Sequence, residues 1–113
     1  MEVMRSPYQV RGSAYESLKK WDAAIADFNS AIKLEPTSFH AYFMRGETWA
    51  KQEQHEKAVA DYTKALELEP TYLDALRGRS ASWTVLGEEE KATADLQRAA
   101  ALENDAADDT KIE

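Results

Sequence analysis

The sequence has no cysteine, three prolines and four glycines among its 113 residues. Without cysteine the chain forms no disulfide bond, no thiolate nucleophile and no thiolate metal site, which favours a reducing compartment and predicts a cytoplasmic location, bacterial by preference. No apolar run approaches the about 18 residues that a membrane-spanning helix needs. Residues 1–10 also lack the apolar core of a secretory signal.

Histidine is equally scarce. His40 and His55 are the only two, and no HxxxH or HExxH spacing is present. We expect His40 at the start of one helix and His55 in a turn, where it replaces an aromatic residue, Trp21. The glycines are too scattered to cradle a phosphate group. These absences predict a non-catalytic protein with no metal site and no cofactor.

An excess of basic charge is also missing, since the formal net charge is −7. Residues 1–36 are neutral overall, whereas residues 71–113 carry five basic and ten acidic side chains. Binding to phosphate backbones or anionic lipid headgroups requires clustered basic groups. The charge therefore argues against nucleic acid and against a membrane surface as partners.

What the chain does contain is a repeat with a constant period of about 34 residues, without insertion or deletion. Large and small residues recur in the same order in each copy, and such a period is typical of stacked repeats that cannot bury their apolar faces alone. The first copy holds Tyr8, Gly12, Tyr15, Ala24, Phe28, Ala31 and Pro36; the second Tyr42, Gly46, Trp49, Ala58, Tyr62, Ala65 and Pro70; the third Leu76, Ser80, Trp83, Ala92, Leu96, Ala99 and Asn104.

Each copy reads as two helices joined by a short turn. Ser6 before Pro7 predicts a capped helix start, and Asp22 and Thr71 are predicted to cap later helices. Pro36 and Pro70 are predicted to end the second and fourth helices. The predicted helices cover residues 7–18, 22–35, 39–51, 56–68, 72–86 and 88–102.

This pattern resembles the tetratricopeptide repeat family, which shows the same order of aromatic, glycine, alanine and proline positions within one repeat. The third copy departs, with Ser80 in place of glycine, Asn104 in place of proline, and Gly78 two residues out of register. The resemblance implies an all-α solenoid, a right-handed stack of three antiparallel helix-turn-helix hairpins. We expect one domain at residues 1–104, with repeats at about 5–38, 39–72 and 73–104, and a loose acidic tail at 105–113.

In this family the first helix of each hairpin lines a concave surface, so the resemblance implies a protein-interaction module or scaffold that holds a peptide there. The peptide-binding residues expected on that surface are Gln9, Ser13, His40, Phe43, Glu47, Lys51, Asp74, Arg77 and Thr84. Phe43 is the expected anchor, because nothing in the core pattern of its hairpin requires it.

Some relatives grip a chaperone's C-terminal carboxylate with basic residues, but the matching positions here include Glu47 and Asp74, which would repel it. The alternative function is a self-assembly module that forms homo-oligomers through its repeat ends.

Two further patterns carry expectations. The ladders Arg11, Arg45, Arg79 and Asp27, Asp61, Asp95 recur once in every repeat at the same register. We expect each aspartate to pair with the arginine of the next hairpin, with pairing inside a hairpin as the alternative. Thr93 and Ala100 stand where earlier copies have larger aliphatic residues, which predicts an exposed outer face on the last helix and a natural end near Leu102.

Overall fold

The computed structural model describes residues 6–111, with side chains described to residue 106. Within this range the chain is all-helical, as predicted, and no strand is present. The helices are α1 (Pro7–Ser17), α2 (Trp21–Leu34), α3 (Phe39–Lys51), α4 (His55–Leu68), α5 (Leu73–Val85) and α6 (Glu89–Lys111). No helix in the described part is long and apolar enough to cross a membrane.

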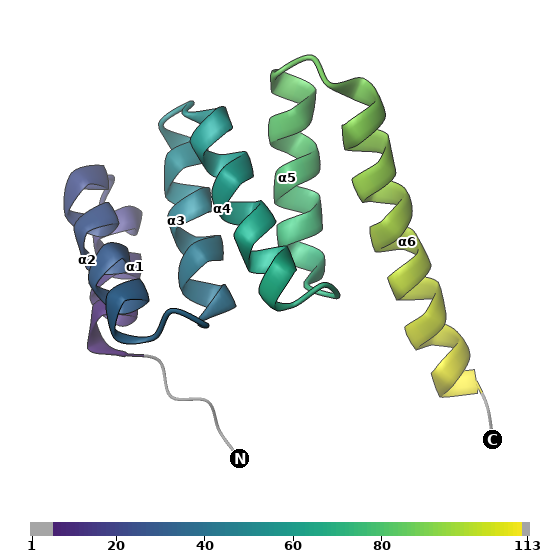
Figure 1. Ribbon diagram of the computed structural model, residues 1–113, viewed down its shortest axis with the longest axis horizontal. Coiled ribbons are helices and arrows are strands. Elements are labelled where there is room, and N and C mark those ends of the chain that lie inside the picture. Colours follow the sequence, from purple (N-terminus) through teal and green to yellow (C-terminus); the bar gives the residue numbers. More distant parts are fainter. Residues whose placement is uncertain (1–5, 112–113) are drawn as a thin grey trace.

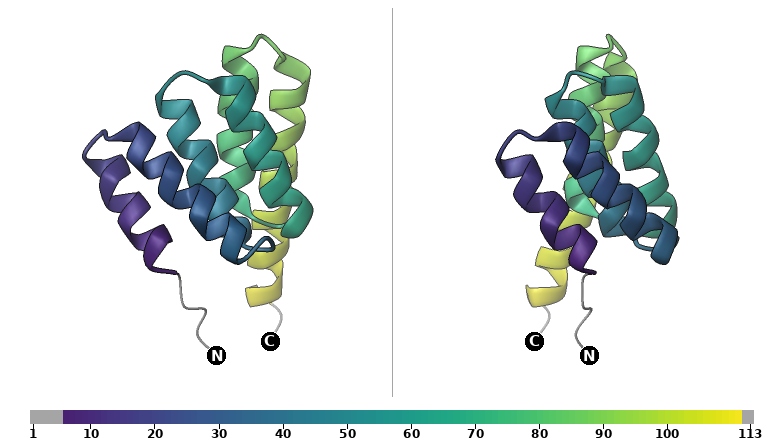
Figure 2. Two further views of the ribbon diagram at one scale, coloured as in Figure 1. Left: turned by 60° about the vertical axis from the view of Figure 1, so that its left-hand side comes forward. Right: turned by 90° about the vertical axis from the view of Figure 1, so that its left-hand side faces the viewer.

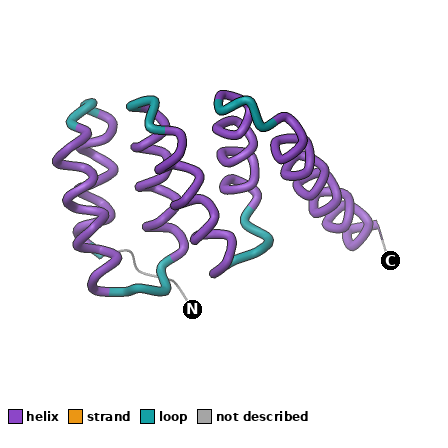
Figure 3. Tube along the Cα trace, turned by 45° about the horizontal axis from the view of Figure 1, so that its top comes forward, coloured by secondary structure: helices purple, strands orange, loops and turns teal. Residues whose placement is uncertain are grey.

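The helices form three hairpins that lie side by side (Figure 1). Each hairpin packs chiefly within itself, as α1 on α2, α3 on α4 and α5 on α6, and then on the next hairpin through α2 on α3 and α4 on α5. Turns within hairpins lie at one end of the stack and the connections between hairpins at the other (Figure 3). The helix axes rotate gradually from the first hairpin to the third (Figure 2). This is the predicted solenoid.

Local capping only partly follows the prediction. Ser6 caps α1 by accepting a hydrogen bond from the backbone N–H of Gln9, and Ser38 caps α3 in the same way. The predictions for Asp22 and Thr71 were wrong. Asp22 lies inside the first turn of α2, whereas Thr71 precedes the N-cap of α5 and donates its hydroxyl to Glu69 at 2.5 Å.

The loose tail was also a wrong prediction, because α6 continues through residue 104 to Lys111. Pro36 and Pro70 stand just after α2 and α4, whereas Asn104 takes this place in the third copy and leaves the helical hydrogen bonds uninterrupted. Residues 112 and 113, the end of the predicted tail, lie outside the described residues.

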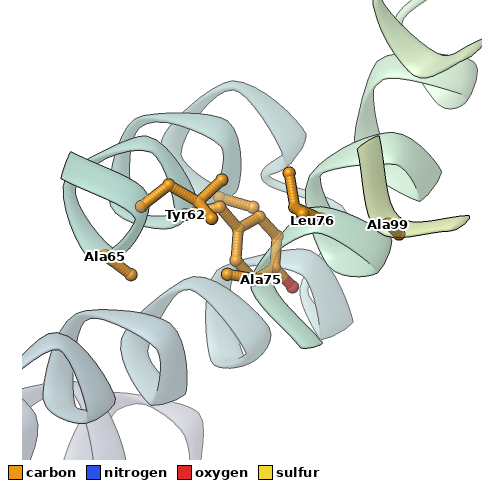
Figure 4. Packing of buried hydrophobic residues seen from close by; sticks show 7 residues of the cluster. Tyr62, Ala65, Ala75, Leu76 and Ala99 are labelled. Atoms are coloured by element: carbon orange, nitrogen blue, oxygen red, sulfur yellow. The ribbon is translucent and has the colours of Figure 1, made fainter. Parts of the chain in front are cut away.

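The core forms where an aromatic ring from the second helix of a hairpin presses on a glycine of the first. Phe28 and Tyr62 are fully buried. A Cβ atom added at Gly12 would lie 2.7 Å from the Phe28 ring, and one added at Gly46 would lie 3.2 Å from Tyr62. Alanines fill the neighbouring contacts between helices, as Ala65 and Ala75 do around Tyr62 (Figure 4). The helices therefore approach closely because small residues face large rings.

Gly78, which breaks the repeat register, is explained by the same ring. A Cβ atom at Gly78 would lie 2.7 Å from Tyr62 Cζ and 3.0 Å from its hydroxyl oxygen. Tyr62 is longer than its counterpart Phe28, so its tip reaches past α3 to the surface of α5. Gly78 therefore makes room for the hydroxyl of the preceding hairpin.

The charge ladders pair inside each hairpin, so our preferred pairing of Asp27 with Arg45 was wrong. The guanidinium of Arg11 donates two hydrogen bonds to Asp27, both at 2.8 Å, and Arg45 does the same to Asp61 and Arg79 to Asp95. The hydrogen bond to Arg11 lowers the pKa of Asp27 below its usual value. A bidentate fork of this kind fixes the orientation of both side chains.

A third donor of the arginine nevertheless crosses to the preceding hairpin. Arg45 Nη1 donates to Asn29 of α2 at 2.8 Å, and Arg79 Nη1 donates to Thr63 of α4 at 3.1 Å. The acceptor lies two residues beyond the aspartate that we expected. Each of these arginines thus joins three helices.

Thr93 and Ala100 are exposed, as predicted for the outer face of the last helix. Their counterparts Val59 and Leu66 are buried against the third hairpin. The two small residues thus lie on a face that no described helix covers.

The turn inside each hairpin contains one residue with positive φ, again at the same register. These residues are Lys19 and Glu53, both at 61°, and Gly87 at 82°. Only glycine adopts this region without a steric penalty, which is about 1–2 kcal/mol for other residues. The first two turns therefore hold a residue that the backbone does not favour.

We expect Glu53→Gly to raise the free energy of unfolding by about 0.5–1 kcal/mol, because the relief of strain outweighs the added freedom of the unfolded chain. Gly87→Ala should lower it by about 1 kcal/mol. Glu53→Ala is the control and should change little, since alanine keeps the strained φ. Urea denaturation measures all three, and an unstable Glu53→Gly variant would contradict the strain argument.

Candidate functional site

The predicted binding residues all come from α1, α3 and α5, the first helices of the three hairpins. These helices are in contact in the order α1, α3, α5 and so form one layer. We call the surface that carries these residues the first-helix face. It comprises Gln9, Ser13, His40, Phe43, Glu47, Lys51, Asp74, Arg77 and Thr84.

Gln9 lies at the end of this face nearest the start of α1 and is buried. Its side-chain amide donates to the hydroxyl of Ser38, the residue that caps α3, at 2.8 Å. Gln9 therefore ties the first hairpin to the second. Its role in peptide binding stays a prediction, and its side-chain donor is already engaged by Ser38.

Phe43 was expected to be an exposed anchor, but it is half-buried and belongs to an aromatic group. Its ring centroid lies 5.0 Å from that of Tyr72 and 5.9 Å from that of Tyr62. His40 lies beside it at 6.3 Å, with Nδ1 within 3.2 Å of the Tyr72 hydroxyl. Phe43 faces the start of α5 in the same register as Gln9 faces the start of α3. It therefore has a structural role between hairpins and offers only one side to a ligand.

Glu47 lies where the Tyr62 hydroxyl emerges between α3 and α5. The hydroxyl donates to Glu47 Oε2 at 2.5 Å. Burial first, and this hydrogen bond second, raise the pKa of Tyr62 well above its usual value, so the hydroxyl stays protonated. The Tyr62 ring fills the space that a side chain at Gly78 of α5 would take. The result is a carboxylate that caps a buried phenol hydroxyl where α3 meets α5.

Two basic residues of the face are neutralised by partners. Lys51 forms an ion pair with Glu16 at 2.9 Å, and Arg77 pairs with Glu103 of α6. Lys51 and Glu16 also line an open cavity of about 400 Å³ beside the first turn. Both basic side chains of this face are therefore partly neutralised by a neighbouring carboxylate.

Thr84, farther along α5, donates its hydroxyl to the backbone oxygen of Ser80 at 3.1 Å.

Asp74 is exposed and forms no ion pair within the described residues, and Ser13 is half-buried. Asp74 precedes Gly78 by one helical turn, so the two residues lie on the same side of α5. With Glu47, it makes this part of the face acidic. No group of three metal-ligating side chains occurs among the described residues.

Two contributors to this face were not predicted: Tyr62 and Tyr72. Tyr62 stands at a core position of the repeat and is buried, so its sequence place gives no sign that its hydroxyl reaches Glu47 of the first-helix face. The displaced glycine at Gly78 was the available signal. Tyr72 takes the register of Ser38. It is the N-cap residue of α5 but makes no side-chain capping hydrogen bond, and its ring contacts Phe43.

Comparison of the chain with known families gives two matches, both described as tetratricopeptide repeat. One covers residues 6–38 and the other residues 40–72. Together they span more than half of the chain and coincide with the first two hairpins. No curated protein sequence matches the chain.

Solved structures share this arrangement of helices. A crystal structure of MamA aligns with a TM-score of 0.87 and 25% identity over 89% of this chain, which spans 59% of the MamA chain. The Arabidopsis OM64 TPR domain gives 0.82 and 26% over 87% of this chain and 81% of that one. The second TPR of Spaghetti (RPAP3), solved with the HSP90 peptide SRMEEVD, gives 0.82 and 24% over 84% of this chain and 88% of that one.

The contacts of Phe43 change the expected effect of removing it. We expect Phe43→Ala to lower the free energy of unfolding by about 2 kcal/mol, roughly half the cost for a fully buried ring. Phe43→Leu, which keeps part of the packing, should cost less than half of that. Thermal or urea unfolding tests this, and unchanged stability in Phe43→Ala would restore the view of Phe43 as a free anchor.

Proposed function

The chain belongs to the tetratricopeptide repeat family, and we propose that it is a non-catalytic interaction module that holds a peptide segment of a partner protein against the first-helix face. The observation that supports this most is the layer of three first helices. It places a cluster of aromatic rings beside the acidic residue Glu47; the rings are those of His40, Phe43 and Tyr72. A cluster of apolar side chains with polar acceptors beside it is the usual composition of a peptide-binding site.

The charge of this face indicates the kind of peptide. The HSP90 peptide in the Spaghetti structure, SRMEEVD, is rich in acidic residues. Here Lys51 and Arg77 are already paired, whereas Asp74 has no ion pair among the described residues. An acidic peptide would meet Glu47 and Asp74 without a compensating cation. We therefore infer a peptide with a lysine or arginine instead.

Such a side chain can lie beside Asp74, which is exposed near the start of α5. Its methylene groups cover the neighbouring surface of the first helices, whereas the space of a side chain at Gly78 is already filled by the Tyr62 ring. The cationic end then reaches the carboxylates of Glu47 and Asp74, which flank the glycine. The rings of His40 and Phe43 provide apolar contact for a neighbouring residue of the peptide.

The non-catalytic part of the proposal is supported by how the polar groups are used. Glu47 accepts from Tyr62, Lys51 pairs with Glu16, and Thr84 bonds to its own helix. A catalytic centre needs polar groups that converge on a substrate cavity with unmet bonding capacity. These groups bond to each other instead.

Self-assembly through the repeat ends is the weaker alternative. It requires an apolar surface on the outer side of α6. Thr93 and Ala100, which take the place of Val59 and Leu66, offer little of it.

Binding of a basic peptide should depend on Asp74. We expect Asp74→Lys to weaken binding of a lysine- or arginine-containing peptide, selected from a peptide array, by about tenfold, because one attraction becomes a repulsion. Glu67→Lys is the matched control, since Glu67 is an exposed acidic residue on α4, outside the first-helix face. It should leave the affinity unchanged. An array that enriches acidic peptides, or equal losses in both variants, would contradict the proposal.

A further inference from the structure

A second surface of the protein lies on α1, on the side that no described helix covers. Its side chains are spaced as on one side of a helix: Tyr8, Arg11, Tyr15 and Leu18. We call it the open α1 face. Tyr8 is 37% exposed and Leu18 is 65% exposed. The Arg11 guanidinium lies 5.9 Å from both tyrosine ring centroids, so these three side chains form a continuous stripe. Leu18 follows as the C-cap residue of α1.

In the third hairpin the same register is covered by a helix. The open α1 face has its counterpart on α5, two repeat periods later, and α4 packs on it. The residues at the four matching positions are Leu76, Arg79, Trp83 and Leu86. Leu66 joins Leu76 in the core, and Thr63 accepts from Arg79. Val59 lines one cavity of about 280 Å³ together with Trp83 and Leu86. Leu76 is therefore only 3% exposed, in contrast to Tyr8.

The second hairpin repeats the arrangement. α2 packs on α3, and Asn29 accepts from Arg45 at 2.8 Å. The side chain of Arg45 is 23% exposed and that of Arg79 is 21% exposed, whereas that of Arg11 is 60% exposed. In the two covered copies a helix precedes the first helix of the hairpin and packs on it, whereas no described helix precedes α1.

Arg11 retains the donor that the other two arginines use between hairpins. Its Nε and Nη2 atoms donate to Asp27, as in the other copies. Its Nη1 atom makes no hydrogen bond within the described part of the chain. Asp27 holds the guanidinium in place. The Nη1 donor of Arg11 therefore has the same orientation as the Nη1 donors of Arg45 and Arg79, which bond to Asn29 and Thr63.

We propose that the open α1 face binds an amphipathic helix of a partner protein, antiparallel to α1, as α4 lies on α5. The partner helix presents an aliphatic residue to Tyr15 and Leu18. Four residues later it presents an asparagine or threonine oxygen to Arg11 Nη1, and three residues after that a second aliphatic residue to Tyr8. This spacing is that of Val59, Thr63 and Leu66 in α4 and of Ile25, Asn29 and Ile32 in α2.

A second copy of the chain matches this requirement poorly. The helix whose corresponding side is uncovered is α6, and its residues at the three positions are Thr93, Gln97 and Ala100. Gln97 supplies an amide oxygen, but threonine and alanine replace both aliphatic residues. The corresponding sides of α2 and α4 are already occupied within the stack. The occupant is therefore a helix with larger apolar residues than α6 offers.

The chain itself provides the probe for this site. A synthetic peptide with the sequence of residues 55–68 contains the α4 pattern. A covalent bridge between positions 60 and 64, both exposed in α4, keeps it helical, because a free peptide of this length is only marginally helical. Titration of the intact ¹⁵N-labelled protein with this peptide should shift the amide signals of α1, and the concentration dependence gives the affinity.

Variants of protein and peptide make the test specific. Leu18→Glu should weaken binding at least about fivefold, since it removes an apolar contact and buries a charge. Val85→Glu is the matched control, because Val85 is 64% exposed and lies outside the open α1 face. It should bind as the wild type does. A Thr63→Val peptide, which loses the acceptor for Arg11, should bind about fivefold more weakly.

The proposal is overturned if the peptide does not bind, if it shifts α3 or α5 in place of α1, or if Leu18→Glu and Val85→Glu behave alike. Sedimentation of the protein without peptide provides a further outcome. Self-association that Leu18→Glu abolishes would identify a second copy as the occupant and overturn the assignment to a partner protein. None of these results depends on peptide binding at the first-helix face.

Discussion

The stacking of this protein depends on an arginine that joins three helices. Arg45 grips Asp61 of its own hairpin with two parallel hydrogen bonds and reaches Asn29 of the preceding hairpin with a third. The bidentate contact sets the direction of the guanidinium. The remaining donor can therefore reach the acceptor on the neighbouring hairpin in only one register of the two hairpins. Desolvation offsets much of the attraction in a partly buried ion pair, so this contact contributes more to register than to stability.

Close approach of helices is the second requirement, and it connects the core to the surface. The rings of Phe28 and Tyr62 fit against glycines of the first helices. Tyr62 is the longer ring, and its hydroxyl passes through the first-helix layer to Glu47. A core residue thus shapes the face where we propose that a peptide binds, and Gly78 is the local adjustment that permits it. The site and the fold share the same packing contact.

The constant repeat period was sufficient to predict the helices, the hairpins and the family, because burial on one side of each helix repeats with it. It could not decide how Arg11 and Asp27 pair, since a strict repeat places every aspartate both after one arginine and before another. Nor could it reveal the contacts of Phe43, which depend on Tyr72 in a position where the first copy has Ser38. The tail was predicted from its charge, whereas the absence of a helix-ending proline at Asn104 decided its structure.

Contacts between neighbouring hairpins hold the stack together, so each hairpin should be most protected where a neighbour covers it. Native-state hydrogen exchange measures this directly, because the protection of each amide reports the free energy of opening its helix. We predict the highest protection in α3 and α4, which have neighbours on both sides, and markedly lower protection in α1, whose outer side no described helix covers. Equal protection of α1 and α3 would contradict the claim that contacts between hairpins determine the stability of the stack.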